Sequence, residues 1–530
     1  MVFEDEHLLV VNKPPGWNTH APAPYAGEGV YDWLRHREQR WASLALVHRL
    51  DKETSGLLAF AKTAQANRSL TEQFSTRTTA KRYVFLTHGA GPERELVAKT
   101  ALVRLGERYA SRPVHPGAAV AETRFRSLGK AAGHTQIEAE PLTGRTHQIR
   151  VQAAEAGFPV LGDRLYGGEP AARVFLHAAS LRLRHPTTAQ VLDFAAPPDW
   201  ETARHLALRN ALIDPALTDA YRLVHGQADG REPVFVDRLG DFLLAHADRP
   251  LNQTQRDLVA ALLARCGARG VYHRLLERRA RHTARELLCP AHLLGAEAEP
   301  EIRVRENGVT FALRFKEGYG AGLFLDQRDN RRRLLVNHVA AGFPAFSVPP
   351  KEARVLNLFA YTCGFSVCAA LAGAQTTSVD LSRRYLDWGQ RNFQVNGLNP
   401  AAHEFLVGDA FAWLRRLRRR GRRFHVVLVD PPTFATSKEG GAFVVGRDLG
   451  RLVVSAAGLL QEQGALFVAT NAAAYAPERL VATVCAAVQR AGLSVVAQHY
   501  APQPPDFPLS RAQPAHLKTL WLRLRSAGAA

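Results

Sequence analysis

The sequence has few cysteines, and their spacing matches neither a metal site nor a disulfide-stabilised fold. It contains five cysteines in 530 residues: Cys266, Cys289, Cys363, Cys368 and Cys485. No two of them form a CxxC pair, and their spacing shows no regular framework. Disulfide-stabilised secreted domains and zinc ribbons are therefore disfavoured. We expect reduced thiols, a cytoplasmic protein and no bound metal.

A long apolar run and a targeting leader are also missing. No uninterrupted apolar segment reaches the roughly 18 residues at which a membrane-spanning helix becomes the usual interpretation. The N-terminus carries Glu4, Asp5 and Glu6 in place of basic residues and an apolar stretch, so we expect no signal peptide. We therefore predict a protein that does not associate with a membrane.

Negative charge is scarce relative to positive charge. The chain has 68 lysines and arginines against 49 aspartates and glutamates, which gives a formal net charge of +19. Such a balance favours a polyanionic partner, usually nucleic acid, although genomic base composition can also enrich arginine. The 46% of hydrophobic residues is ample for real cores. On length alone, we expect about three domains.

The most informative segment is a polar loop between two apolar runs, 44–47 and 57–61, which predict buried strands. It reads His48-Arg49-Leu50-Asp51-Lys52-Glu53-Thr54-Ser55-Gly56. Such a loop is held by the rigid elements on either side of it. An aspartate beside an arginine in this position is suited to nucleophilic or acid–base chemistry more than to packing.

This string, continued through Leu57, resembles the catalytic loop of the RluA family of pseudouridine synthases. Four further segments resemble motifs of the same family and follow its order, at 12–16, 79–86, 142–151 and 162–167. The resemblance covers residues 1–205. It implies an α+β domain with a mixed antiparallel sheet that needs no cofactor.

The same resemblance implies roles for four residues. Asp51 would be the nucleophile, attacking either the base or the sugar, and this choice stays open. Arg49 would help to flip the uridine out of its stack, and Tyr83 would stack on the extracted uracil. Arg150 would pair with Asp51 and keep its carboxylate ionised. Taken one at a time, Arg49 and Arg150 would be interpreted as surface ion pairs and Tyr83 as a core aromatic. Their occurrence together in the family's motif order favours an active site.

The beginning of the chain departs from many relatives of this family, which carry a small extra RNA-binding domain there. Here the first expected strand starts within ten residues of Met1. We therefore expect other parts of the chain to dock the RNA.

The middle of the chain predicts a second, smaller domain. Prolines near 195–200 end the first module, and 206–218 is the expected linker. Residues 219–317 then predict a hairpin at 234–245, a helix at 257–266, and strands at 270–275 and 309–315. This mixed α/β domain resembles the one that precedes the catalytic domain in the RlmI/RlmK class of ribosomal RNA methyltransferases.

Residues 318–530 alternate strand-like and helix-like patterns, which is typical of a parallel, doubly wound Rossmann-like sheet. The expected strands are 355–359, 376–379, 404–407, 426–429 and 466–469. Ligands bind beyond the carboxyl ends of such strands, and polar residues gather there. Asp380 follows the first strand by about 20 residues, a spacing suited to binding ribose hydroxyls. A nicotinamide site would need G-x-G-x-x-G, of which only Gly364 is present.

Asp430-Pro431-Pro432-Thr433-Phe434 resembles the fourth motif of base methyltransferases that use S-adenosylmethionine. The segment 322–328 resembles the one leading into the cofactor site of RlmI/RlmK relatives. Asp430 would be catalytic. The residues implied to bind the cofactor are Asn357, Phe359, Tyr361, Thr362, Gly364, Asp380, Asp409, Asp326 and Arg328. The residues implied to face the target base are Pro431, Pro432, Thr433, Phe434 and Asn471.

Several alternatives stay open at this stage. Any single strand-end aspartate could be a helix N-cap. The arginine-rich stretch 415–423 predicts either phosphate contacts or a solvated helix end.

The chemistry of the target base is constrained by missing thiols. Methylating carbon 5 of cytosine needs a covalent cysteine, yet 430–434 and 469–475 contain none. Nitrogen 7 of guanine has its own lone pair and needs only positioning. The segment 433–438 and Asn471 resemble the guanine-N7 branch of RlmK, which we favour.

Together these patterns predict a bifunctional RNA-modifying enzyme that isomerises uridine and methylates a base, with large-subunit ribosomal RNA favoured over transfer RNA by resemblance. Three alternatives are kept. The first is the same synthase with 5-methylcytosine or transfer RNA methylation. The second is an RNA-binding ribosome-assembly factor with one silent head. The third is a synthase fused to a protein or small-molecule methyltransferase. No pattern indicates an oligomeric state.

Overall fold

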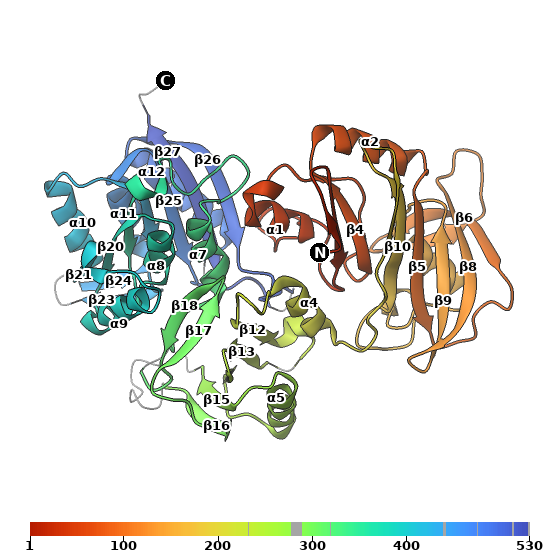
Figure 1. Cartoon of the computed structure of the whole chain (residues 1–530), viewed down its shortest axis with the longest axis horizontal. Helices are drawn as coiled ribbons and strands as arrows, with labels where there is room; N and C mark the ends of the chain where they lie inside the picture. Colours follow the sequence, from red (N-terminus) through yellow and green to blue (C-terminus); the bar gives the residue numbers. More distant parts are fainter. Residues whose placement is uncertain are drawn as a thin grey trace. The chain divides into compact units, whose positions relative to one another are not determined.

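The computed structural model describes residues 1–231, 233–276, 289–317, 320–437, 441–473, 475–510 and 513–527 (Figure 1). The chain divides into two compact units. Unit 1 comprises Met1–Pro22, Glu28–Arg35 and Arg40–Ala211. Unit 2 comprises Leu212–Ala530 together with Ala23–Gly27 and His36–Gln39. Among the described residues, no helix is both long and apolar enough to span a membrane.

Unit 1 is built on one 11-stranded sheet, ordered β1-β2-β4-β10-β5-β9-β8-β6-β7, with β3 paired to β4 and β11 to β10. Only its β4–β10 pair is parallel, so the expected mixed antiparallel sheet is confirmed. The strands are β1 (Phe3–Glu4), β2 (Leu8–Lys13), β3 (Ala45–Leu46), β4 (Ser55–Ala61), β5 (Ala80–Thr87), β6 (Leu96–Leu105), β7 (Arg108–Arg112), β8 (Val120–Ala131), β9 (His134–Pro141), β10 (Leu176–Arg184) and β11 (Val191–Ala195).

Unit 1 has two hydrophobic cores, which pack the elements on either side of the polar loop 48–56. The first packs α2 (Ala64–Ser75) against β2, β4 and β10 through residues such as Leu70 and Leu181. The second packs α3 (Gln148–Glu155) against β5, β8 and β9 through Ile149, Phe85 and Phe125. The polar loop leads into β4, Tyr83 lies on β5 and Arg150 lies on α3, so the two cores place the three segments around one space. The remaining helices in this part of the chain are α1 (Val30–Arg37) and α4 (Arg204–Leu212).

The first part of unit 2 is a five-stranded sheet in the order β12-β13-β14-β15-β16. The expected hairpin is β13–β14, and the expected helix is α5 (Gln253–Arg265). The predicted strand at 309–315 is β18 (Val309–Leu313), which pairs with β17 (Ile302–Glu306) in a separate ribbon. The sheet strands are β12 (Ala220–His225), β13 (Phe235–Leu239), β14 (Phe242–Ala247), β15 (Gly270–Leu275) and β16 (Ala291–Gly295).

The second part of unit 2 is a seven-stranded sheet in the order β21-β20-β19-β22-β25-β27-β26. All five predicted strands are present and parallel, but β27 runs antiparallel to both its neighbours, so one edge of the sheet is mixed. The strands are β19 (Arg354–Leu358), β20 (Gln375–Asp380), β21 (Glu404–Val407), β22 (Phe424–Val429), β25 (Leu460–Thr470), β26 (Leu493–Pro502) and β27 (Lys518–Ser526). A hairpin of β23 (Phe434–Ser437) and β24 (Gly441–Val444) follows β22.

Helices connect the strands of this sheet, and the first strand β19 lies between β20 and β22, where the strand order reverses. Cofactors bind at such a switch point in doubly wound folds. The helices are α7 (Arg328–Leu335), α8 (Gly364–Leu371), α9 (Arg383–Gln394), α10 (Ala410–Arg419), α11 (Val445–Ala457) and α12 (Pro477–Arg490).

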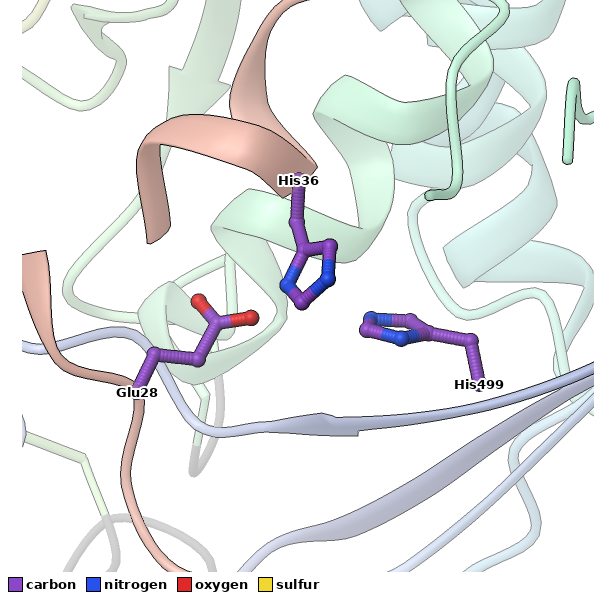
Figure 2. A group of neighbouring side chains, drawn as sticks. All are labelled: Glu28, His36 and His499. Atoms are coloured by element: carbon purple, nitrogen blue, oxygen red, sulfur yellow. The ribbon is translucent and has the colours of Figure 1, made fainter. Parts of the chain in front are cut away.

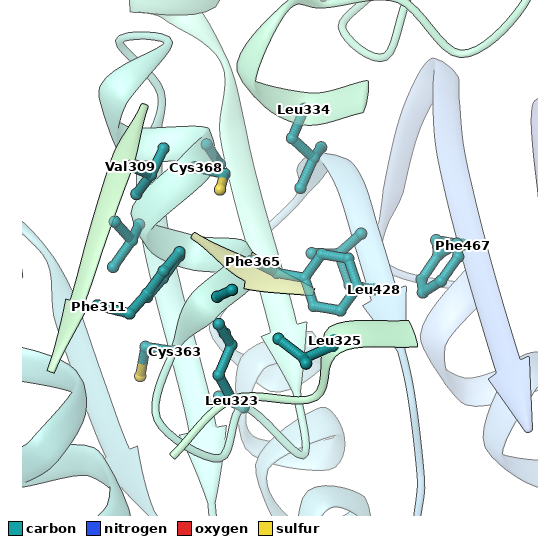
Figure 3. Close-up of a cluster of buried hydrophobic side chains, with 14 of the residues drawn as sticks. Val309, Phe311, Leu323, Leu325, Leu334, Cys363, Phe365, Cys368, Leu428 and Phe467 are labelled. Atoms are coloured by element: carbon teal, nitrogen blue, oxygen red, sulfur yellow. The ribbon is translucent and has the colours of Figure 1, made fainter. Parts of the chain in front are cut away.

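One core joins the ribbon β17–β18 to the seven-stranded sheet (Figure 3). Val309 and Phe311 of the ribbon belong to the same buried cluster as Phe365 of α8 and Phe467 of β25. Because this core crosses the expected border at 317–318, that border stays a prediction, and so does the linker 206–218, part of which is helix α4.

Two candidate active sites

A cavity of about 700 Å³ in unit 1 is lined by Arg49, Asp51, Tyr83 and Arg150. The structure thus brings together all four residues expected in the synthase site. Three further basic side chains line the same cavity, namely Arg77, Lys81 and Arg145. A cavity of this volume accommodates a nucleotide, and its basic wall suits a phosphate backbone.

The backbone on both sides of Asp51 is fixed by buried side chains. Thr19 accepts a hydrogen bond from the Leu50 amide and donates one to the Leu50 carbonyl, at 3.1 and 2.8 Å. The Lys13 ammonium donates to the carbonyls of Lys52, Pro14 and Trp17. Lys13 is fully buried, and burial lowers its pKa to about 7. This anchoring holds the loop in one conformation.

Arg150 contacts Asp51 but is held by a different carboxylate. Its Nη1 lies 3.4 Å from Asp51 Oδ2, whereas its Nε and Nη2 donate to the two oxygens of Asp163 at 2.6 and 2.9 Å. Burial acts to lower the pKa of Arg150, but the hydrogen bonds and charge of Asp163, together with the charge of Asp51, outweigh it and raise the pKa. Asp163 received no role from the sequence, although it lies in the segment 162–167. The structure shows that it aims the guanidinium at Asp51.

Tyr83 and Arg49 line the same cavity, but Tyr83 is more buried than Arg49. Burial, followed by the charge of Asp51, raises the pKa of Tyr83 well above its usual value, so its hydroxyl keeps its proton at neutral pH. Arg49 is exposed at the cavity. These positions suit a stacking aromatic and a base-flipping arginine, and both roles stay predictions.

In unit 2, the loop after β19 has an unusual backbone. Phe359, Tyr361 and Cys363 all adopt left-handed conformations, with φ of 58°, 49° and 62°. Each such non-glycine residue costs free energy and persists only where surrounding contacts impose it. Thr362 supplies two of these contacts, since its hydroxyl donates to the Gly322 carbonyl at 2.6 Å and its carbonyl accepts from the Asn392 amide at 2.9 Å. Strained loops of this kind cluster at ligand sites.

Asp380 lies beside this loop at the end of β20. Its carboxylate accepts hydrogen bonds from the backbone amides of Tyr361 and Ser382, both at 2.9 Å. Burial raises the pKa of Asp380, against the effect of these amides. Each carboxylate oxygen keeps a further lone pair, so the residue can still accept from ribose hydroxyls.

Three other residues expected to bind the cofactor are already engaged in the fold. Asp409 caps α10 by accepting from the Ala412 amide at 3.0 Å, which is the alternative that the sequence left open. Arg328 is buried, and its two terminal nitrogens donate to Asp506 at 2.8 and 2.6 Å. Asn357 is buried as well, and its amide donates to the Ser366 hydroxyl. This geometry favours structural roles for all three side chains, and their cofactor contacts stay untested predictions.

Gly364 begins α8 directly after the strained loop, and a Cβ atom there would lie 3.2 Å from the Arg331 side chain. The glycine therefore lets the loop pack closely against α7.

The acceptor side of the site centres on Asp430, which follows β22. Gln327 donates to Asp430 Oδ2 at 2.9 Å. Burial, and then the charge of Asp326, raises the pKa of Asp430 to about 7. Asp326 itself lies 3.0 Å from His516 Nε2. Asp430 therefore changes charge close to neutral pH.

The expected base-facing residues directly follow Asp430 in the sequence, apart from Asn471. Thr433 donates its hydroxyl proton to Asn471 Oδ1 at 2.8 Å, so two residues far apart in the sequence meet. Pro431 is buried, Pro432 and Thr433 are exposed, and Phe434 is partly buried. Lys438, part of the same expected segment, lies outside the described residues.

The two cysteines of the cofactor loop and α8 are not exposed as nucleophiles. Cys363 and Cys368 lie in the hydrophobic core (Figure 3), and burial raises the pKa of each to about 12. The expected thiol positions hold Thr433 and the segment 469–475, which contains no cysteine.

Figure 2 draws three side chains that could offer metal ligands, Glu28, His36 and His499. Glu28 belongs to unit 1, and the two histidines belong to unit 2. Since the positions of the units relative to each other are not determined, we assign no metal site to these residues.

Comparisons with known proteins match both halves of the chain. The RNA pseudouridylate synthase family model matches residues 7–155, and the S-adenosylmethionine-dependent methyltransferase family model matches residues 249–523. Ribosomal large subunit pseudouridine synthase C of Yersinia pestis is 39% identical over 229 residues, which are 40% of this chain and 70% of that protein. The Escherichia coli K12 protein of the same name is 37% identical over 227 residues, again 40% and 70% of the two chains.

Among solved structures, the methyltransferase SMU.776 in complex with SAH aligns with a TM-score of 0.50 and 25% identity, over 71% of this chain and 98% of that one. S-adenosylmethionine is therefore the cofactor of unit 2, and the residues present at the switch point fit it. The chain belongs to the RNA pseudouridine synthase family in its N-terminal part and to the S-adenosylmethionine-dependent methyltransferase family in its C-terminal part, and it is an enzyme of both kinds.

Proposed function

We propose that this enzyme modifies large-subunit ribosomal RNA in the cytoplasm, isomerising one uridine and methylating nitrogen 7 of a guanine. The substrate class is supported by the relatives of unit 1, whose names specify the large ribosomal subunit. It is also supported by the net charge of +19 and by the basic cavity of unit 1.

In the synthase half, Asp51 attacks the flipped uridine while Arg150 steadies its carboxylate. The uracil then turns so that carbon 5 replaces nitrogen 1 at the sugar. The Tyr83 ring stacks on the uracil, and its hydroxyl passes its own proton to water as it takes the proton that leaves carbon 5. Arg49 fills the space that the uridine leaves.

The observation that carries the methylation target is the hydrogen bond between Thr433 and Asn471. Because Asn471 Oδ1 accepts the threonine proton, its Nδ2 group is directed to act as a donor. The guanine edge that contains nitrogen 7 presents acceptors only, N7 itself and O6. A donor on O6 would turn N7 toward the methyl group of the cofactor.

Asp430 complements this arrangement electrostatically. Methylation at N7 moves positive charge from the sulfonium onto the guanine ring. In this proposal the ionised carboxylate of Asp430 stabilises that charge. Covalent activation of a cytosine would instead need a thiol, and the cysteines of the methyltransferase core are buried.

The test uses RNA that carries 5-fluorocytosine, incubated with S-adenosylmethionine and the full-length Asp51→Asn enzyme. This background prevents the synthase half from trapping the fluorinated pyrimidine itself. We expect no adduct that survives denaturation, and 7-methylguanosine as the only methylated nucleoside by mass spectrometry. A stable protein–RNA adduct, or 5-methylcytosine in the product, would overturn the proposed target.

The RNA class is tested separately by mapping pseudouridine and methylated bases in ribosomal and transfer RNA from a strain lacking the gene. Loss of both marks from large-subunit ribosomal RNA is expected. Loss of the marks from transfer RNA alone would show that transfer RNA is the substrate instead. If neither mark were lost, a role in ribosome assembly would be favoured.

A further inference from the structure

A second side chain approaches the nucleophile of unit 1. His147 Nε2 lies 3.8 Å from Asp51 Oδ2, and both residues line the cavity. The backbone of His147 is left-handed, with φ of 58°, at the N-terminus of α3. Its side chain makes no capping hydrogen bond to that helix. A strained, non-glycine residue whose side chain does not cap its own helix points to a functional constraint.

The imidazole of His147 is held by a tyrosine that is itself held by the backbone. The Tyr166 hydroxyl, at the end of a short 3₁₀ turn (Arg164–Tyr166), lies 2.7 Å from His147 Nδ1. The same oxygen accepts a hydrogen bond from the Tyr109 amide of β7 at 2.9 Å. Three segments of the chain therefore form one series of hydrogen bonds that ends at the His147 imidazole, beside Asp51.

This series of hydrogen bonds determines where the imidazole proton resides. Burial raises the pKa of Tyr166, so the phenol keeps its proton at neutral pH. Within the described part of the chain, His147 Nδ1 is the acceptor in hydrogen-bond range of that proton. A neutral imidazole that accepts at Nδ1 carries its own proton at Nε2. The N–H group is then directed at Asp51.

We propose that His147, held by Tyr166 and Tyr109, is a positioning residue for the synthase reaction. Its Nε2–H donates to the Asp51 carboxylate once RNA occupies the cavity. The separation of 3.8 Å in the free enzyme is longer than a hydrogen bond, and catalytic hydrogen bonds commonly tighten when substrate binds.

The charges around His147 explain why a neutral donor suits this place. Burial is the largest influence and lowers the pKa of His147, as do Arg150 and Arg49, while Asp51 and Asp163 act to raise it. The imidazole is therefore neutral at pH 7. Arg150 already supplies a full positive charge to Asp51, and a second cation would stabilise the carboxylate further and weaken it as a nucleophile. A neutral N–H group orients the carboxylate without that cost.

The experiment compares His147→Ala, His147→Gln and Tyr166→Phe in the full-length enzyme by single-turnover pseudouridine formation. The glutamine amide can place an N–H group near the position of Nε2. We expect His147→Ala to lower kcat about 10-fold with little change in KM, the loss of one hydrogen bond to a charged group. His147→Gln should recover most of that loss, and Tyr166→Phe should give an intermediate value.

A spectroscopic readout separates this role from a structural one. Nitrogen-15 NMR of histidine-labelled enzyme should show His147 protonated at Nε2 and bare at Nδ1, with both tautomers present in Tyr166→Phe. The His147→Gln spectrum identifies the signal. A proton on Nδ1 in the wild-type enzyme, or equal defects in His147→Gln and His147→Ala, would refute the proposal.

The matched control is His185→Ala. His185 Nε2 lies 2.9 Å from Asp5 in the same unit but does not line the cavity, so this variant removes a similar histidine–carboxylate contact. Its kcat should equal that of the wild-type enzyme. Methyl transfer and thermal unfolding, measured for every variant, show whether the chain has folded.

Discussion

At the scale of single residues, the predicted nucleophile Asp51 has a basic neighbour, Arg150, that a second carboxylate, Asp163, also binds. Arg150 is bound by Asp163 as well as by Asp51, so replacing Asp51 does not leave a buried charge without a partner. We therefore expect Asp51→Asn to lower pseudouridine formation by about 10³-fold or more, because the amide is not a nucleophile. The free energy of unfolding should change by less than about 1 kcal/mol. Isomerase assays and thermal unfolding check this, and substantial activity in the purified variant would contradict the role of Asp51.

Asp430 is a second residue whose surroundings make a measurable prediction. Its pKa is raised to about 7 in the fold, so between pH 4 and 7 the folded protein binds a proton that the unfolded chain has lost. This group's contribution to stability therefore falls as the pH rises through that interval. Asp430→Asn should be more stable than the wild-type enzyme at pH 8, by about 1–2 kcal/mol, and nearly equal to it at pH 4.

Methyl transfer should respond to the same titration in the opposite sense. The ionised carboxylate is the useful form, so the wild-type rate should rise with pH through about 7. Asp430→Asn should lose both that dependence and most of the rate. A pH–rate profile with no inflection between pH 6 and 8 in the wild-type enzyme would contradict this assignment.

At the scale of elements, local strings in the sequence predicted the main site residues, but not what holds them. Asp51, Tyr83 and Arg150 stand in recognisable motifs, and the structure brings them to one cavity. The bidentate Arg150–Asp163 pair depends on how α3 packs beside the turn that contains Asp163. Pairing between segments is decided by tertiary packing, which no local pattern encodes.

A motif residue can also be engaged by its own fold. Arg328 was assigned to the cofactor through the segment 322–328 and Asp409 through its place at a strand end. The Arg328 guanidinium is buried against Asp506 and the Asp409 side chain caps α10, while their cofactor contacts stay predictions. A sequence motif contains residues that build a site as well as residues that contact the ligand. The last two strands, β26 and β27, were not among those predicted, and the antiparallel direction of β27 is set by its pairing with β25 and β26.

The loop between β19 and α8 gives a prediction for this element. Asp380 stabilises the loop by accepting a hydrogen bond from the Tyr361 amide, and it is also the residue predicted to bind the cofactor ribose. Asp380→Ala should weaken S-adenosylmethionine binding by about 10- to 100-fold, the loss of hydrogen bonds to a charged acceptor. Calorimetry checks this. The control is Asp387→Ala, an exposed carboxylate on α9, which should leave the affinity unchanged.

The end of α10 gives another prediction. Arg415, Arg418, Arg419 and Arg420 are exposed, and within the described chain none of them forms an ion pair. Replacing the last three with glutamine should reduce the salt dependence of RNA binding by roughly 0.7–0.9 per lost phosphate contact, with kcat at saturating RNA unchanged. The control is Arg126→Gln with Arg182→Gln, two exposed arginines that pair with Glu138 and Asp193. An unchanged salt slope in the triple variant would mean that this stretch is only a solvated helix end.

At the scale of the whole molecule, each catalytic set lies inside one unit with its own hydrophobic cores. The synthase residues are held by the two cores of unit 1, and the cofactor loop and Asp430 by those of unit 2. Among the described residues, each of these four cores draws its members from one unit only. Two chemically unrelated reactions can then coexist on one chain without constraining each other's residues.

This separation predicts complementation between inactive variants. Full-length Asp51→Asn should methylate RNA at the wild-type rate, and full-length Asp430→Asn should form pseudouridine at the wild-type rate, each within about twofold. An equimolar mixture of the two variants should then place both marks on the same RNA population, with each reaction limited only by the halved concentration of its active site. Nucleoside mass spectrometry of the products measures both marks at once. If either single variant lost the other activity while its thermal unfolding stayed normal, the two sites would be coupled, and the independence argued from their separate cores would be wrong.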